Sequence, residues 1–121
     1  METHNYEKLT VWQKSMDLVV GIYGMTGVFP KEEIYGLTSQ MKRAAVSIPS
    51  NIAEGCRRKT NKDFSHFLTI AFGSGAELET QLRIAKRLKF YGENEYVRVE
   101  PLLQEVMRML NKLISSLPTT N

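Results

Sequence analysis

Apolar residues recur along this chain at intervals of three and four, the spacing that places side chains on one face of an α-helix. A first helix is predicted over residues 8–27, with a stripe made of Leu9, Trp12, Met16, Val19 and Tyr23. A second is predicted over residues 31–59, with a stripe made of Ile34, Leu37, Met41, Ala45, Ile48, Ile52 and Gly55. Pro30 separates the two segments, because proline disfavours helical backbone in the residue before it.

The clearest periodicity covers residues 61–91, where apolar and small residues form the heptad seam of a bundle helix. The members of this seam are Phe64, Leu68, Ala71, Gly75, Leu78, Leu82 and Ala85. Thr60 is a suitable N-cap, and Gly92 is predicted to be the left-handed residue after the helix. A fourth helix is predicted over residues 94–117, on the stripe Tyr96, Val99, Leu103, Val106, Leu110, Leu113 and Leu117.

Two prolines interrupt this pattern. Pro49 lacks a backbone donor and would clash with the carbonyl of Ala45, but the apolar stripe keeps its phase across it. We therefore expect a kink rather than a break. Two alternatives remain open for Pro101: the fourth helix starts late, with this proline in its first turn, or it bends there.

Four amphipathic helices joined by short loops predict an all-α, single-domain, up-down-up-down four-helix bundle spanning residues 1–121. With 42% hydrophobic and 24% charged residues, the composition is that of an ordinary globular domain. No apolar run approaches the roughly 18 residues needed to cross a bilayer. The first residues do not look like a signal peptide. The chain has a single cysteine, Cys56, which excludes an internal disulfide. We expect a cytoplasmic protein that does not bind membranes.

No arrangement of residues indicates catalysis. His4 and His66 are the two histidines, and neither follows a glutamate by three residues, as di-iron bundles require. Cys56 has no histidine near it in sequence, so nothing indicates an activated nucleophile. The Ser39-x-x-Lys42 pattern lacks its companion motifs. We expect a non-enzyme without a metal or another cofactor.

Basic residues gather in two places. One group lies between the second and third helices and consists of Arg57, Arg58, Lys59 and Lys62. The other lies near the end of the third helix and includes Arg83, Lys86 and Arg87. Together with Arg43 they are candidates for binding the phosphates of RNA or DNA. An equally supported alternative is that these cations are solvated helix ends, and the net charge of only +3 is modest for a nucleic-acid binder.

Two further patterns concern contacts between helices or subunits. A polar stripe accompanies the apolar one on the second helix, and the third helix carries matching groups; the candidate network is Ser47, Ser50, Asn51, Glu54 and Glu77. Its alternative is an ordinary exposed face. The third helix also carries apolar residues outside its seam, namely Ile70, Phe72 and Ile84. A helix with one buried face does not need these residues, so they predict self-association.

Several longer strings carry a resemblance to a known family: residues 9–14, 29–55, 63–68 and 73–79. The chain resembles the bacterial four-helix-bundle proteins named after the intervening sequences of 23S rRNA genes, over residues 9–117. The resemblance implies a homopentameric ring or barrel and no enzymatic activity. The family name reflects gene location. A related branch serves as the accessory protein of diversity-generating retroelements, where a basic ring surface contacts reverse transcriptase and nucleic acid.

Two functional hypotheses follow. The first is a non-enzymatic, oligomeric helical bundle that binds RNA or DNA through its basic surface. The alternative is a protein-interaction adaptor, whose ring docks a protein partner and whose charges only keep it in solution.

Overall fold

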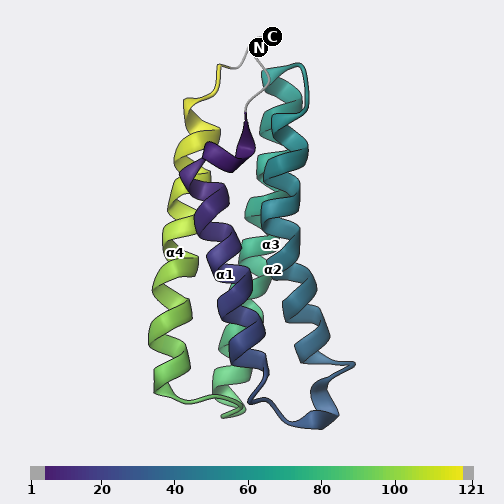
Figure 1. Cartoon of the computed structure of the whole chain (residues 1–121), viewed down its shortest axis with the longest axis vertical. Coiled ribbons are helices and arrows are strands. Elements are labelled where there is room, and N and C mark those ends of the chain that lie inside the picture. The colour runs from purple at the N-terminus through teal and green to yellow at the C-terminus, as the bar shows by residue number, and fades with distance from the viewer. Residues whose placement is uncertain (1–4, 119–121) are drawn as a thin grey trace.

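The computed structural model describes residues 5–118, which form a bundle of four α-helices without strands in that range. The elements are η1 (Tyr6–Lys8), α1 (Thr10–Thr26), η2 (Lys31–Glu33), α2 (Leu37–Cys56), α3 (Asn61–Arg87) and α4 (Glu93–Ser116). Each helix runs antiparallel to the one before it (Figure 1). Helix α1 packs against α2 and α4, and α3 packs against the same two helices. The predicted all-α, up-down-up-down architecture is therefore confirmed.

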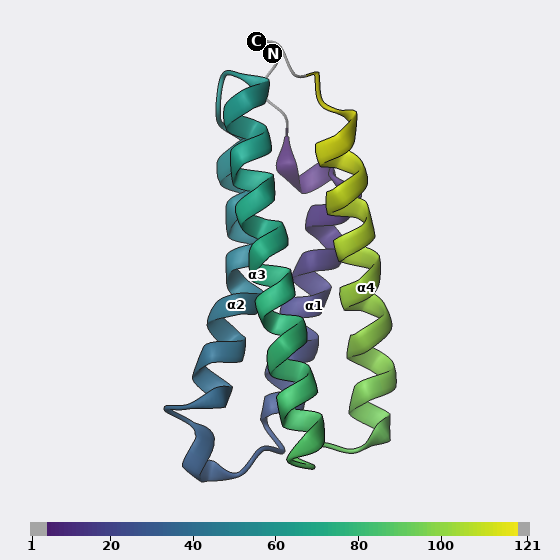
Figure 2. The same ribbon diagram turned by 180° about the vertical axis from the view of Figure 1, so that it is seen from behind.

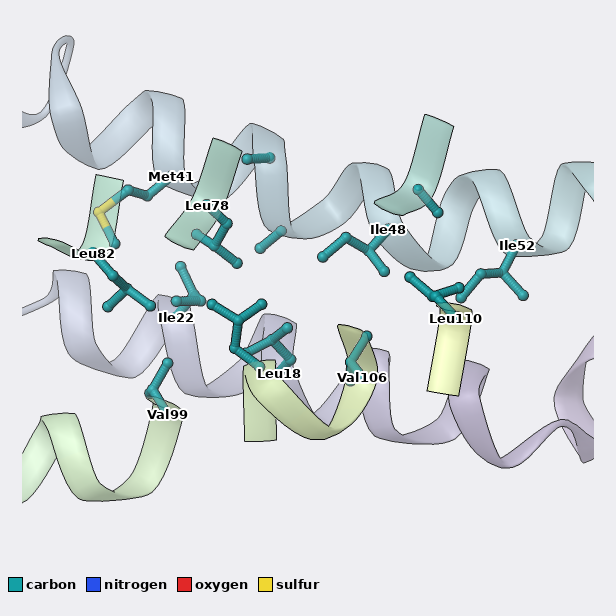
Figure 3. Close-up of a cluster of buried hydrophobic side chains, with 14 of the residues drawn as sticks. Leu18, Ile22, Met41, Ile48, Ile52, Leu78, Leu82, Val99, Val106 and Leu110 are labelled. Carbon is teal, nitrogen blue, oxygen red and sulfur yellow. The ribbon is translucent and has the colours of Figure 1, made fainter. Parts of the chain in front are cut away.

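The core lies along the axis of the bundle and receives side chains from all four helices (Figure 3). All seven predicted seam residues of α3 are buried, from Phe64 to Ala85. On α4 the central members of the predicted stripe are buried, whereas Tyr96, Leu113 and Leu117 are partly exposed. On α2 the stripe from Met41 to Gly55 is buried. These parts of the predicted core are confirmed.

The predicted stripe of the first helix lies at the edge of the buried face instead of at its centre: Leu9, Trp12 and Val19 are partly buried and pack against the core. The buried residues of α1 are Val11, Ser15, Leu18, Ile22, Met25 and Thr26, whereas Met16 is 41% and Tyr23 47% exposed. The two stripes have the same spacing and lie one residue apart, which is about 100° around a helix. Periodicity alone could not choose between them. On the second segment Ile34 is also exposed, because it lies before the helix begins.

The second helix differs from the predicted 31–59 at both ends. Residues Lys31–Glu33 form a 3-10 turn, and α2 begins at Leu37. The carboxylate of Glu33 accepts a hydrogen bond from the Leu37 N–H at 3.1 Å, so this acid caps the helix from outside instead of lying in its first turn. The helix ends at Cys56, and three basic residues follow it in the turn.

Both prolines lie inside continuous helices. Helix α2 does not break at Pro49, as expected. Near it, side chains bond helix carbonyls: the Ser50 hydroxyl donates to the Val46 carbonyl at 2.8 Å, and the Asn51 amide donates to the Ser47 carbonyl at 2.8 Å. Helix α4 begins at Glu93, well before Pro101, which excludes the late start.

The end of α3 does not use Gly92 as predicted. Lys89 adopts the left-handed conformation, with φ of 59°, and Gly92 has an ordinary φ of −98°. The Phe90 N–H donates to the Ala85 carbonyl and the Lys89 N–H to the Lys86 carbonyl, each at 3.0 Å. This is the Schellman pattern of helix ends. Gly92 instead precedes α4, where its N–H donates to the Glu95 carboxylate at 2.8 Å.

Candidate nucleic-acid interface

The turn between α2 and α3 carries the first basic group, which we call the turn cluster: Arg57, Arg58, Lys59 and Lys62. All four residues are exposed. The turn is ended by Thr60, whose hydroxyl accepts a hydrogen bond from the Asp63 N–H at 3.1 Å and caps α3. Both ribbon views place this turn at the same end of the bundle as η1 and the end of α4 (Figure 2).

Two members of the turn cluster contact neighbouring side chains. Arg58 pairs with Glu54 at 2.5 Å, with 44% of its own side chain exposed, and lies 4.7 Å from the centroid of the Phe67 ring. Arg57 lies 5.7 Å from the centroid of the Tyr6 ring. A surface ion pair of this kind contributes little to stability. These contacts orient the guanidinium groups and leave them accessible to an anion.

The second basic group lies at the opposite end of α3. This helix has 27 residues and so spans about 40 Å at 1.5 Å per residue. Arg83, Lys86 and Arg87 are therefore far from the turn cluster within one chain, although all three are exposed. The structure does not bring the two groups into one patch, and Arg43, midway along α2, belongs to neither.

Arg83 connects α3 to α4. Its guanidinium contacts Glu100 at 2.8 Å and Glu79 at 3.3 Å. Gln104 donates a hydrogen bond to Glu100 at 3.1 Å and another to Glu79. Burial alone would raise the pKa of the Glu100 carboxyl, but the hydrogen bonds from Arg83 and Gln104 outweigh burial and lower it. The hydrogen bond to Glu100 raises the pKa of Arg83, more than burial lowers it. This geometry gives Arg83 a structural role.

Lys86 also contacts α4, since its ammonium lies 3.7 Å from the centroid of the Tyr96 ring. The neighbouring Tyr91 hydroxyl donates to the Leu82 carbonyl at 3.0 Å, and burial is the main reason that its pKa is raised to about 12. Within residues 5–118, Arg87 forms neither an ion pair nor a cation–π contact with α4, unlike Arg83 and Lys86.

The polar stripe forms an interhelical contact at its centre. The hydroxyls of Ser47 and Ser74 share a hydrogen bond of 2.8 Å between α2 and α3, and Asn51 donates to the Ser47 hydroxyl at 2.9 Å. The other predicted members act differently. Ser50 bonds within its own helix, and Glu54 pairs with Arg58.

Beside this contact, a shallow groove of about 240 Å³ runs between α2 and α3 and is lined in part by Glu77 and Gln81. Gln81 is only 6% exposed, and its side-chain oxygen is buried without a hydrogen-bond partner in the described part of the chain. Ile70 and Ile84 are each seven residues from Glu77 and therefore share its face of α3; they are 39% and 44% exposed. Phe72 instead packs against the core.

A second groove, which the sequence pattern did not indicate, lies between α1 and the start of α2 and has a volume of about 560 Å³. Its lining consists of Tyr23, Ile34, Tyr35, Ser39, Lys42, Arg43, Val46 and Ser47. We call it the tyrosine groove. The signal available in the sequence was Tyr35, an aromatic residue just before a helix that carries two adjacent cations.

The remaining chemistry of the described residues is sparse. Cys56 is fully buried, and burial raises the pKa of its thiol more than Arg57 lowers it, so the nucleophilic thiolate is disfavoured. His66 is exposed beside the Phe67 ring, and His4 lies outside the described residues. Within residues 5–118 no three histidine, cysteine or acidic side chains come together as metal ligands. No helix in this range has the length and apolar character to span a membrane.

Comparisons with known proteins identify a matching family and a similar solved structure. Residues 7–112 match the family described as 23S rRNA-intervening sequence protein. A similar solved structure is that of a protein of unknown function from the S23 ribosomal protein family of Bacteroides thetaiotaomicron VPI-5482. It superposes with a TM-score of 0.80 at 24% identity, over 88% of this chain and 96% of that one. At this identity the likeness establishes the fold alone. No curated protein matches the chain.

Proposed function

The chain belongs to the 23S rRNA-intervening sequence protein family, and we propose that it is a non-enzymatic, oligomeric helical bundle that binds RNA or DNA. The turn cluster is the main support for this proposal, because its four exposed cations lie close together at the turn between α2 and α3. Arg58, which pairs with Glu54, still has 44% of its side chain exposed. Cations arranged in this way neutralise phosphates and release counterions, which favours binding.

The experiment is a titration of labelled RNA and DNA oligonucleotides at several salt concentrations. The test variant combines Arg57→Glu, Arg58→Glu and Lys59→Glu. The control combines Arg98→Glu, Arg108→Glu and Lys112→Glu, which makes the same charge change at exposed positions of α4. We expect the test variant alone to lose affinity and to give a shallower salt dependence, by about 0.7 per lost contact on a single strand. Equal losses in both variants would mean that net charge, rather than the turn cluster, governs binding.

We also propose self-association through the outer face of α3. Its support is the pair of exposed isoleucines, Ile70 and Ile84, on one face of the helix. A second copy of the chain would cover these apolar side chains. The homopentamer implied by the family resemblance is the assembly we propose.

The second candidate function is a protein-interaction adaptor. It is favoured by the outer face of α1, where Met16, Val20 and Tyr23 are 41%, 72% and 47% exposed. Exposed apolar patches of this kind mark protein interfaces. Affinity capture after nuclease treatment tests this function: recovery of a specific partner that is lost with Val20→Asp supports it, and recovery that depends on RNA contradicts it. For either function we propose the cytoplasm, where the free thiol of Cys56 would remain reduced.

A further inference from the structure

The tyrosine groove combines an accessible ring with fixed positive charge. Tyr35 is 97% exposed and Ile34 51% exposed, so the ring of Tyr35 makes almost no contact that stabilises the fold. On the wall of the groove, the Lys42 ammonium lies 4.6 Å from the centroid of the Tyr23 ring, and Arg43 is exposed beside it. The groove therefore combines an accessible aromatic ring with two cations.

Among residues 5–118, no acidic residue lines this groove. Neither Lys42 nor Arg43 forms an ion pair within the same range. The neighbouring acid, Glu33, has its carboxylate oxygen bonded to the Leu37 N–H, where it caps α2. The charge of this open groove is therefore complementary to an anion.

We propose that the tyrosine groove is a subsite for single-stranded nucleic acid, in which a base stacks on Tyr35 and the adjoining phosphate contacts Lys42 and Arg43. Aromatic rings beside a basic groove are the arrangement by which proteins bind single strands without reading sequence. A duplex fits this site poorly, because its bases are already stacked on one another. The inference rests on the proposed nucleic-acid binding and adds to it the strand type and a second contact point away from the turn cluster.

An acidic peptide is the competing occupant, since it would also be attracted by the two cations. The ring of Tyr35 favours the nucleic acid, because every base has a face that can stack on it. The distinguishing property is dependence on the ring itself: stacking requires an aromatic side chain but does not require the tyrosine hydroxyl.

The test measures fluorescence anisotropy with a labelled 12-nucleotide RNA and with the matching RNA duplex. Three variants are compared with the wild type: Tyr35→Ala, Tyr35→Phe and the pair Lys42→Ala with Arg43→Ala. Because Tyr35 is exposed, thermal unfolding should be unchanged in its variants, which serves as the folding control. We expect Tyr35→Ala to weaken single-strand binding about tenfold with an unchanged salt slope. Tyr35→Phe should retain the affinity. The double variant with Lys42→Ala and Arg43→Ala should bind more weakly, and its affinity should depend less steeply on salt concentration.

A second readout locates the contact directly. RNA that contains 4-thiouridine is cross-linked by light, and the protein is digested with trypsin. We expect the label on the peptide that spans residues 32–42, which contains Tyr35, and we expect duplex to compete poorly for it.

The outcomes separate this inference from the proposed function. Loss of binding in the turn-cluster variant, with no effect of Tyr35→Ala and no label on residues 32–42, overturns the groove and leaves the turn cluster in place. If Tyr35→Ala lowers the affinity for single strands and the turn-cluster variant does not, the groove is supported as a binding site and the turn cluster is overturned as one. Equal affinity for single strand and duplex also overturns the groove. If the wild type binds neither RNA nor the DNA oligonucleotides, both proposals are overturned.

Discussion

Two glycines show how single residues determine the approach of helices α2 and α3. A Cβ placed on Gly55 would lie 2.9 Å from Cδ1 of Phe64, 3.0 Å from Cβ of Phe67 and 3.3 Å from the Phe64 carbonyl oxygen. Two of these atoms belong to the Cβ and the backbone of α3, which cannot move away independently. Gly73, in contrast, has nothing within 4 Å of the same position. The close packing of α2 on α3 therefore requires a glycine at position 55, whereas position 73 has room for a larger residue.

We therefore predict opposite effects of the same substitution at these two sites. Gly55→Ala should lower the free energy of unfolding by about 1–3 kcal/mol, because overpacking outweighs the better helix propensity of alanine. Gly73→Ala should raise it by about 0.5–1 kcal/mol, because alanine replaces glycine inside an exposed stretch of helix. Urea denaturation at one protein concentration measures both values. A neutral or stabilising Gly55→Ala would contradict the close approach of α2 and α3.

At the scale of elements, α4 is held to α3 by a polar cluster as well as by the core. Glu100 is 9% exposed, and one of its carboxylate oxygens has no hydrogen-bond partner within residues 5–118. The other accepts hydrogen bonds from Arg83 and Gln104. A buried carboxylate is tolerated only while such partners are present. This cluster therefore depends on the ionisation of Glu100.

The lowered pKa of Glu100 predicts a pH dependence of stability. The pKa of Glu100 in the folded state lies below the ordinary value of 4.5, so the ionised carboxylate stabilises the fold at pH values above 4.5. This stabilisation is lost as the pH falls through the lower pKa of the folded state. We expect the difference in free energy of unfolding between wild type and Glu100→Gln to shrink between pH 7 and pH 3. Denaturation curves of both proteins across this range test the prediction, and a constant difference would contradict it.

Removing the partner cation tests the same cluster at neutral pH. Arg83→Ala leaves Glu100 without its charged donor and should destabilise the fold by about 1–2 kcal/mol, a reduced figure because the Arg83 side chain is 45% exposed. The control is Arg87→Ala, one turn further along α3 and exposed, which should change stability by less than about 0.5 kcal/mol. Equal effects of the two substitutions would mean that the cluster contributes nothing specific.

At the scale of the whole molecule, apolar side chains remain exposed on the outside of a completed bundle. Ile84 on α3 and Val97 on α4 are similarly exposed, at 44% and 56%. Only Ile84 shares its helix face with a second exposed isoleucine, Ile70. Ile84 and Val97 therefore make a matched pair for testing where copies of the chain meet.

We expect sedimentation to give a mass several times the 13.8 kDa of one chain at micromolar concentration. Ile84→Asp should shift the protein toward the monomer, because a charge on the proposed interface would lose its water on assembly. Val97→Asp should leave the mass unchanged. A wild-type mass of one chain, or equal effects of the two variants, would contradict an interface on α3.

Much of the fold followed from periodicity. The seam of α3 and the central stripes of α2 and α4 were predicted correctly because apolar or small residues recur there without interruption on one face, whereas the apolar residues outside the seam of α3, such as Ile70 and Ile84, form no continuous stripe. On the first helix the centre of the buried face lies one residue away from the predicted stripe, because two neighbouring stripes have the same spacing. The start of α2 was misplaced because the acids at Glu32 and Glu33 suit a helix N-terminus; the structure uses Glu33 from outside the helix instead.

The candidate site was less predictable, because distance in space decides which groups meet. The sequence indicated the turn cluster, whose members are adjacent along the chain. It could not show that Arg83 is paired with Glu100, 17 residues away, or that Tyr35 lies in the same groove as Tyr23. Both facts depend on how neighbouring helices are aligned.

The sequence by itself determined four amphipathic helices and their antiparallel order, because local hydrogen bonding and a repeating apolar face are properties of contiguous residues. The tertiary structure alone decided the rotation of α1 about its axis, the close approach of α2 and α3 at Gly55, and the division of the cations into paired and accessible ones. These features depend on packing between segments far apart in the chain, where side-chain shape and the loss of water decide among arrangements that share one periodicity.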